Sequence, residues 1–362
     1  MMVIGLSIVF IGSDLYFQGI GRPVDYLFLA LTTLYLVRNY RSYSARAGVS
    51  SFAFIFLLLP WLLLGALEGN LLIASAMSVG VLVVFPSMKL YVIQNPQTVD
   101  SGLKITTEII LLFFFFQFFV FYVFTTFIDF NSMLGSIPSR GWNENLNLFR
   151  PSGIYQEPNA YCVAVYCLVA VRAIVFRAKD WTVFIGLVSM MISQSLWGMV
   201  GAVILAYFIY GAKRTGYTLL GLMIFSFMML NALDFSFSDL VDASFTLNRI
   251  ATIDTDASRD GRLGSIGNYF GYENLMFGSG VSSDQFQRLG ANGLAFVLYS
   301  SGILGMLLLL IAFLPRSRLH AKKSIIVLFL FSTFPPFAYM YFWAWLAIMY
   351  SKIPYGVDGK EI

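Results

Sequence analysis

The feature that most constrains this chain is its succession of long apolar runs separated by short polar breaks. A helix needs about 20 consecutive, mostly apolar residues to cross a bilayer. Hydrophobic residues make up 58% of the 362 residues and charged residues only 12%, which leaves too little polar surface for a soluble domain of this size. The sequence therefore predicts an all-α, polytopic integral membrane protein.

The apolar runs predict about twelve transmembrane segments in a single transmembrane domain that covers 1–362. These segments lie near 2–17, 24–37, 51–67, 71–92, 105–128, 160–176, 181–195, 197–212, 215–232, 291–314, 324–335 and 337–351. Ser193-Gln194-Ser195 and Pro335-Pro336 each divide a longer apolar stretch, which predicts half-length helices that meet at a polar or kinked turn. The first run has no basic lead and no cleavage site, so it predicts a retained helix.

The distribution of basic residues predicts the orientation. Sixteen of the 23 Lys and Arg residues fall on one side, most of them in alternate loops, and the other seven, all arginines, fall on the opposite side. The positive-inside rule assigns the richer side to the cytoplasm. Both termini are then cytoplasmic, and two long loops, 129–159 and 233–290, face outward.

The first long loop ends in a well-defined motif, Arg150-Pro151-Ser152-Gly153-Ile154-Tyr155-Gln156-Glu157-Pro158-Asn159. Gly153 allows a sharp turn, and Pro158 suits the first position of the helix that follows. Glu157 then lies at the N-terminus of that helix, where the helix dipole favours a carboxylate. We expect Glu157 to pair with Arg150. A capping role and a catalytic role for Glu157 both remain open and are compatible.

The second long loop carries arginines beside an aromatic patch. These residues are Arg249, Arg259, Arg262, Arg288, Tyr269, Phe270 and Tyr272. A guanidinium grips phosphate or carboxylate through two parallel hydrogen bonds, and aromatic rings stack on sugars. The loop therefore indicates a site for an anionic, lipid-bound substrate; the alternative is a solvated loop that rests on lipid headgroups. The stretch 254–261 lacks the glycine of a calcium loop, so no metal site is predicted.

The only histidine, His320, lies in a basic run on the cytoplasmic side. Any general base on the outward face must then be a carboxylate, or the reaction proceeds without a strong base. Within the apolar runs, Gln117 and the Ser193–Ser195 turn predict hydrogen bonds between helices rather than substrate contacts.

Several stretches together resemble the O-antigen polymerase and O-antigen ligase family of bacterial envelope glycosyltransferases. They are Arg150–Asn159 at the entry to a span, the turn Ser193–Gly198, the arginines Arg259 and Arg262, and Phe277-Gly278-Ser279-Gly280. The chain departs from the family at Ser195-Leu196, where an arginine often follows the serine. The ligase branch is expected to use a histidine in its large periplasmic loop, and 233–290 contains none. That absence favours a polymerase.

The resemblance implies a GT-C-like inner-membrane enzyme that polymerises undecaprenyl-pyrophosphate-linked oligosaccharide repeat units at the periplasmic face, with inversion and without metal or cofactor. Arg150, Arg259 and Arg262 would hold the pyrophosphate, and Glu157 would orient Arg150 or deprotonate the acceptor. The expected substrate contacts are Arg249, Arg288, Tyr155, Asn159, Tyr269 and Tyr272. The implied partners are the lipid-linked glycan donor and acceptor and membrane lipid, with a chain-length regulator protein left open and no nucleic acid.

Three alternatives remain at this point. An O-antigen ligase would transfer finished glycans, a flippase or transporter would need polar groups along a path through the bilayer, and a structural partner would have no catalysis of its own. The charges of this chain gather in loops and at segment ends rather than at mid-span, which disfavours transport.

Overall fold

The computed structural model describes residues 1–16, 22–39, 79–140, 142–143, 148–217, 276–278, 293–312, 317–333 and 339–351. The chain divides into two compact units. Unit 1 comprises Met1–Ser13, Pro23–Gly102 and Ala257–Ile362, and unit 2 comprises Asp14–Arg22 and Leu103–Asp256. The fold is all-α, as predicted, apart from one two-residue antiparallel ladder. The single transmembrane domain over 1–362 stays a prediction.

Unit 1 is built around a helix that is apolar on every side. Its described elements are α1 (Met2–Ile11), α2 (Pro23–Arg38), η1 (Gly80–Val84), α6 (Phe85–Gln94), α17 (Gly293–Ala312), α18 (Arg318–Leu330) and α19 (Met340–Met349). Every residue of α19 is buried, and α1, α2, η1 and α6 all contact it. Its Trp343 leaves no room for a side chain at Gly80. An all-round apolar helix belongs in such an interior.

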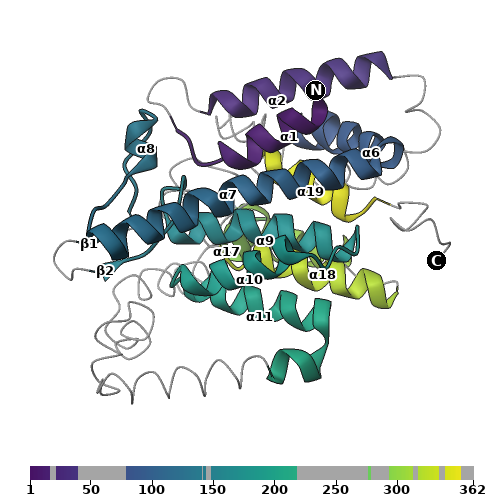
Figure 1. Cartoon of the computed structure of the whole chain (residues 1–362). Helices are drawn as coiled ribbons and strands as arrows, with labels where there is room; N and C mark the ends of the chain where they lie inside the picture. The colour runs from purple at the N-terminus through teal and green to yellow at the C-terminus, as the bar shows by residue number, and fades with distance from the viewer. Residues whose placement is uncertain are drawn as a thin grey trace. The chain divides into compact units, whose positions relative to one another are not determined.

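Unit 2 contains the elements that follow α7 (Pro96–Phe124), a helix whose first residues belong to unit 1. These are α8 (Phe130–Met133), β1 (Trp142–Asn143), β2 (Leu148–Phe149), α9 (Pro158–Ile174), α10 (Trp181–Ile192) and α11 (Leu196–Tyr210). β1 pairs with β2 in antiparallel register, with Trp142 opposite Phe149. Figure 1 shows the end of α7, α8 and the ladder on one side of this unit.

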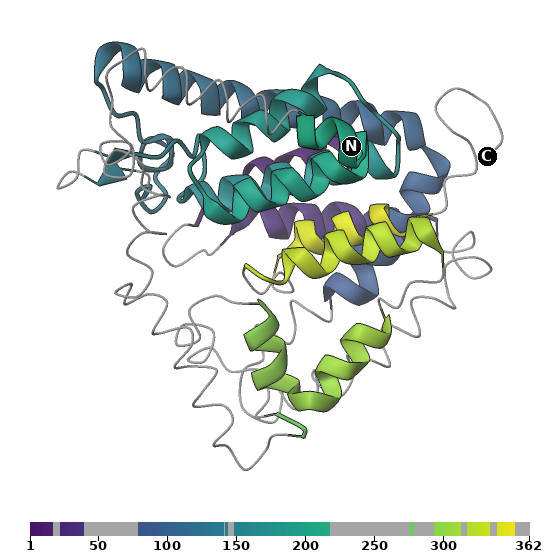
Figure 2. The same cartoon turned by 90° about the horizontal axis from the view of Figure 1, so that it is seen from below.

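The helices α9, α10 and α11 pack against one another in all three pairs, and they lie side by side in Figures 1 and 2. Small residues allow the close approach: a side chain at Gly186 would overlap Val169, and one at Gly198 would overlap Cys162. α9 lies at the centre of this bundle, and from Tyr161 to Ile174 all of its residues are buried.

Polar contacts fix the direction of each helix in the bundle. Arg172 near the end of α9 bonds to Asp180 at the start of α10. The Cys162 sulfur near the start of α9 lies 2.9 Å from the Ser193 hydroxyl just after α10. α10 therefore runs antiparallel to α9, and α11 returns parallel to it. The predicted polar turn at Ser193-Gln194-Ser195 is confirmed, since α10 ends at Ile192 and α11 begins at Leu196.

Two predicted segments have the wrong boundaries at chain reversals. The first helix ends at Ile11 rather than at residue 17, because the chain turns at Gly12 and Asp14 is drawn into a bond with the Gln156 backbone. α7 begins at Pro96 rather than at 105, since proline fits the first turn of a helix. Lys104, expected in a cytoplasmic loop, therefore lies within α7.

The boundaries of three other predicted segments also change. In the segment 71–92, the described part is a π-helical turn followed by α6. The segment 291–314 contains a kink at Gly302, whose φ of 64° and ψ of −167° are non-helical. α18 replaces the segment 324–335 and starts earlier, because Ser317 caps its first turn through the backbone N–H of His320. Pro335-Pro336, the segment 51–67 and all but the start of the segment 215–232 lie outside the described residues.

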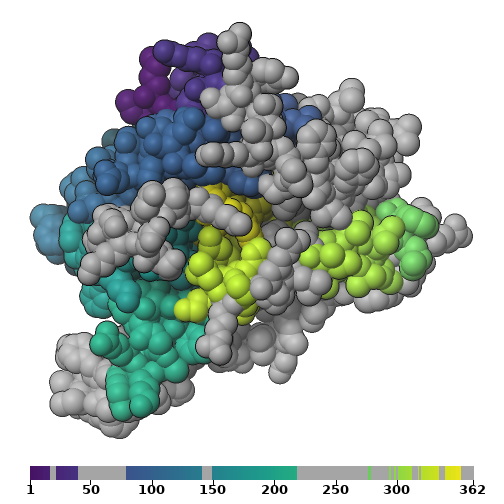
Figure 3. Space-filling model, turned by 90° about the vertical axis from the view of Figure 1, so that its right-hand side faces the viewer, coloured from purple at the N-terminus to yellow at the C-terminus, as the bar shows by residue number. Residues whose placement is uncertain are grey.

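Within the part of the chain that the structure describes, one helix has both the length and the apolar composition to cross a bilayer. This is α7, with 29 residues and a mean hydropathy of 2.1 over its best window, of which only 28% is buried. The remaining apolar helices of this kind have 10 to 17 residues. Large apolar side chains also lie exposed on α11, including Leu196, Val200 and Tyr207, and the surface of α11 is visible in teal in Figure 3.

Candidate functional site

The predicted motif Arg150–Asn159 forms a mostly buried loop between β2 and α9, hereafter the 150–159 loop. Glu157 is the N-cap residue of α9 and Pro158 its first residue, as predicted. Gly153 has a φ of +60°, which fits the predicted sharp turn. A side chain there would approach the backbone nitrogen of Phe114 to 3.2 Å, so the loop lies directly on α7.

Gln117 of α7 anchors this loop. Its side-chain oxygen accepts hydrogen bonds from the backbone N–H of Ser152 at 2.9 Å and of Gly153 at 2.8 Å. Its amide nitrogen donates to the carbonyl of Ile128 at 2.7 Å. The predicted helix–helix role of Gln117 is therefore wrong, because the backbone amides of a buried loop, which need partners away from water, lie against this face of α7.

An aromatic stack between α7 and α9 packs against the same loop. The ring of Tyr155 meets Tyr161 edge-on at 6.0 Å, and Tyr161 stacks on Phe114 at 4.4 Å with the planes 13° apart. The Tyr161 hydroxyl donates to Ser189 at 2.6 Å. Tyr155 is only 1% exposed, as a packing residue would be, so its contact with substrate stays a prediction.

Glu157 pairs with a different arginine from the one expected. Its carboxylate accepts a hydrogen bond from Nη1 of Arg140 at 3.0 Å, whereas the sequence predicted Arg150. A backbone bond from the Arg140 N–H to the Gln156 carbonyl, at 2.6 Å, brings the two chain segments together. The pair is well exposed, with 73% of the Arg140 side chain and 46% of the Glu157 side chain in contact with solvent.

Asp14 reaches the loop from the far N-terminal part of the chain. Its Oδ2 accepts the backbone N–H of Gln156 at 2.6 Å. Burial raises the pKa of Asp14 most strongly, and the charge of Glu157 raises it too. The bond from Gln156 and the positive charges of Arg22 and Arg140 act in the opposite direction, and the net result is a raised pKa. Asp14, Arg22, Arg140 and Glu157 therefore form a four-charge cluster around Gln156, with two charges of each sign.

Arg150 and Asn159 face the helix bundle. Arg150 is half-buried, and its charge acts on the sulfur of Cys162 in α9. The hydroxyl of Ser195 donates to the side-chain oxygen of Asn159 at 3.4 Å and also caps α11 through the Gly198 N–H. The structure thus brings Arg150, Asn159 and the Ser193–Ser195 turn to one end of the α9–α11 bundle.

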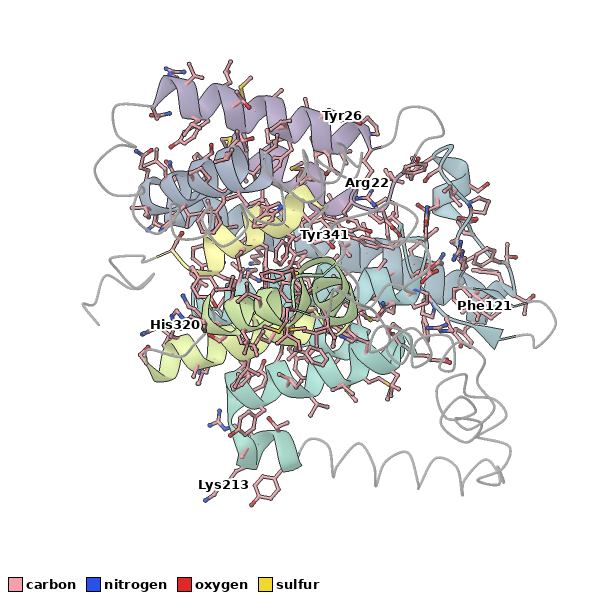
Figure 4. All side chains as sticks on the ribbon, turned by 180° about the vertical axis from the view of Figure 1, so that it is seen from behind. Arg22, Tyr26, Phe121, Lys213, His320 and Tyr341 are labelled. Carbon is pink, nitrogen blue, oxygen red and sulfur yellow. The ribbon has the colours of Figure 1, made fainter. Side chains whose placement is uncertain are left out.

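The opposite end of the bundle carries a separate ion pair. Arg172, 2% exposed, donates to Asp180 through both terminal nitrogens, at 3.1 and 2.7 Å, and also bonds to Thr182. Partial burial works to raise the pKa of Asp180, but the bonds from Arg172 and Thr182 outweigh it and lower the pKa to about 2. Figure 4 labels Phe121, near the end of α7, and Lys213, after α11, and they lie far apart within unit 2.

Six of the predicted site residues lie outside the described part of the chain: Arg249, Arg259, Arg262, Arg288, Tyr269 and Tyr272. The calcium-like stretch 254–261 lies outside it as well. Among the described residues, no three His, Cys, Asp or Glu side chains gather as a metal site would require.

Asp14, Arg22 and Arg140 were not among the predicted site residues. Asp14 gave one usable signal, since it is an acidic residue at the end of an apolar run, and such residues are costly unless they serve a purpose. For Arg22 and Arg140, the only sequence signal was that they belong to the seven arginines predicted on the outward side.

The fold and the site define an all-α protein with charged and polar side chains gathered at one end of a three-helix bundle, where α9 and α11 begin. No family model, no curated protein and no solved structure matches this chain.

Proposed function

We propose that this chain is a bacterial inner-membrane glycosyltransferase that polymerises undecaprenyl-pyrophosphate-linked repeat units into O-antigen or a related surface polysaccharide. It would be a GT-C-like protein with about twelve transmembrane segments, both termini in the cytoplasm and the active site at the periplasmic face. The transfer would invert the anomeric centre and need no metal. The proposal rests on the sequence resemblance and on the placement of Arg150.

The single observation that carries it is the separation of charges along the α9–α11 bundle. Arg150 lies at the same end as the four-charge cluster and begins the loop that Gln117 anchors. Arg177 and Lys179 follow the other end of α9, and Lys213 and Arg214 follow α11. The positive-inside rule would place those four residues at the cytoplasmic surface and Arg150 on the outward side.

The length of α10 supports a position for Arg150 below the outer surface of the bilayer. α10 has 12 residues, or about 18 Å at ~1.5 Å per residue, whereas the hydrocarbon core is about 30 Å thick. With its basic end at the cytoplasmic surface, α10 would end below the outer surface. The Ser193–Ser195 turn and Arg150 would then lie where a lipid-linked diphosphate enters from the bilayer.

In the proposed reaction, an acceptor sugar hydroxyl attacks the anomeric carbon of the growing glycan, and the bond to the diphosphate breaks. Negative charge then grows on the departing undecaprenyl diphosphate. A fixed guanidinium in a partly dehydrated site stabilises that charge without reorganisation, and removal of one such donor costs ~10²–10³ in rate. Arg150 would fill this role together with Arg259 and Arg262, and Asn159 would help to position substrate.

The test is polymerisation by the purified protein with a defined undecaprenyl-pyrophosphate-linked repeat unit, with and without a chelator. We expect a ladder of glycan lengths in both conditions. Arg150→Ala should reduce chain growth by roughly 10²-fold or more. Arg177→Ala, which removes an exposed arginine beyond the other end of α9, should leave chain growth unchanged.

A wild-type protein that forms no polymer under these conditions would refute the proposal. In cells, Arg150→Ala should leave single-unit glycans on the surface and remove longer chains. Complete loss of surface glycan would indicate ligation or transport instead.

A further inference from the structure

The proposed transfer needs a group that takes the proton from the acceptor hydroxyl. The described residues near the 150–159 loop offer three carboxylates: Asp14, Asp129 and Glu157. Unit 2 contains no imidazole, since the only histidine of the chain, His320, belongs to α18 in unit 1. The three carboxylates differ in which of their oxygens accept hydrogen bonds, and this difference indicates which of them can act as the base.

Asp129 uses both of its oxygens to hold the backbone. Oδ1 accepts the N–H of Ser132 at 3.1 Å and caps α8, and Oδ2 accepts the N–H of Ser139 at 2.9 Å. Glu157 is engaged in its ion pair with Arg140, at a position where 46% of its side chain is in contact with solvent. Asp129 thus serves the backbone through both oxygens, and Glu157 serves Arg140 at a solvent-exposed position.

Asp14 differs from both. Its Oδ2 is fixed by the Gln156 N–H, and the described residues supply no hydrogen bond to its Oδ1. Its side chain is half-buried rather than sealed in the interior. One oxygen therefore orients the carboxylate while the other remains available.

We propose that Asp14 is the general base of the transfer, holding Oδ1 toward the acceptor hydroxyl while Oδ2 is fixed by the 150–159 loop. This inference rests on the proposed function. As the hydroxyl oxygen bonds to the anomeric carbon, its proton passes to Asp14. The bond between that carbon and the diphosphate breaks, and the diphosphate leaves with the electron pair. The protonated Asp14 then returns its proton to solvent.

The surroundings of Asp14 suit this role. Burial and the nearby Glu157 raise the affinity of its carboxylate for a proton, while Arg22, Arg140 and the Gln156 N–H keep it from rising too far. Arg150 belongs to the same loop as Gln156, six positions earlier in the sequence. A single anchored loop would thus connect the arginine that stabilises the leaving group to the carboxylate that accepts the proton.

The test compares Asp14→Asn with Asp129→Asn in the full-length protein, reconstituted in lipid nanodiscs with the lipid-linked repeat unit. Asparagine at 14 keeps an oxygen for the Gln156 N–H, so the loop contact survives. We expect Asp14→Asn to lower kcat by ~10²–10⁴-fold with little change in KM, the range that general-base catalysis contributes. Asp129→Asn should stay within about threefold of wild type, since its amide oxygen can still cap α8 and only the bond to the Ser139 N–H is lost.

The pH profile separates a chemical role from a structural one. Wild-type activity should fall at acid pH with a slope of about one in log rate, as Asp14 becomes protonated. Asp14→Glu should retain partial activity, with that acid limb moved along the pH axis. An Asp14→Asn protein that elongates glycans at near wild-type rate would overturn the inference. An Asp14→Glu protein whose activity falls at the same acid pH as wild type would also overturn it. The Asp14→Glu profile decides whether Asp14 is the base if Asp14→Asn does not fold. Failure of the wild-type protein to polymerise would instead count against the proposed function.

Discussion

The side-chain oxygen of Gln117 lies 2.8 Å from the backbone nitrogen of Gly153, and this bond joins the C-terminal half of α7 to the tightest point of the 150–159 loop. The two residues are 36 positions apart in the sequence. Because the same oxygen also accepts the Ser152 N–H, one buried side chain satisfies two buried backbone donors. The loop that carries Arg150 and Glu157 therefore depends on a residue outside it.

Gln117→Leu should destabilise the protein by about 3 kcal/mol, because it leaves two buried N–H groups without an acceptor. We expect a lower midpoint of thermal unfolding for the protein in detergent, and lower polymerisation activity. Gln97→Leu, at an exposed position near the start of the same helix, is the matched control and should change stability little. Equal stability of the two variants would contradict the anchoring role of Gln117.

Gly153→Ala should also destabilise the loop, by about 1–2 kcal/mol, since alanine is strained at a φ of +60° and its Cβ would press on the Phe114 backbone. Gly216→Ala is the control, because a Cβ there meets nothing within 4 Å. Its helical position should make that change neutral or slightly stabilising. Thermal unfolding in detergent measures both, and a Gly153→Ala protein as stable as Gly216→Ala would count against this loop conformation.

Gly198→Ala should weaken the contact between α9 and α11, because the new Cβ would overlap the sulfur of Cys162 and approach the Met190 carbonyl to 3.2 Å. We expect a loss of about 2 kcal/mol. Cys162→Ala removes that sulfur, so the double variant should lose less than the sum of the single losses. A double-mutant cycle on unfolding free energies measures this coupling, and strict additivity would show that the two side chains do not meet.

Asp180→Asn should cost about 2 kcal/mol at neutral pH, because it takes the carboxylate from the buried Arg172 guanidinium. The pKa of Asp180 lies at about 2, below its ordinary value of 3.8. A lowered pKa gives stability that is present above the ordinary value and is lost as the pH falls toward the folded one. The stability gap between wild type and Asp180→Asn should thus narrow from about pH 4 downward. Unfolding scans from pH 7 to pH 3, with Lys179→Gln as the control, would measure this difference in stability. A difference that stays constant over this pH range would show that the ion pair does not cause it.

Arg140→Gln and Glu157→Gln should move the acid limb of polymerisation in opposite directions. The positive charge of Arg140 lowers the pKa of Asp14 and the negative charge of Glu157 raises it. Loss of Arg140 should therefore shift the limb to higher pH, and loss of Glu157 should shift it to lower pH. Both residues are largely solvent-exposed, so neither change should alter stability by more than about 0.5 kcal/mol. Shifts in the same direction would exclude Asp14 as the titrating group.

Local rules predicted part of this site well. Pro158 predicted the start of α9 and placed Glu157 at its cap, since proline suits the first turn and little else in a helix. Gly153 predicted a sharp turn, and the Ser193–Ser195 break predicted the division between α10 and α11. Each of these predictions depends on a few neighbouring residues and on backbone sterics alone.

The all-α class and the local boundaries of this loop can be predicted from the sequence alone, because apolar runs and proline and glycine positions act over short distances. The pairing of Glu157 with Arg140, and the bond between Asp14 and Gln156, 142 positions away, depend on tertiary packing. Those contacts follow from which chain segments the packing of helices brings together. Side chains separated so widely in sequence carry no local signal of that proximity.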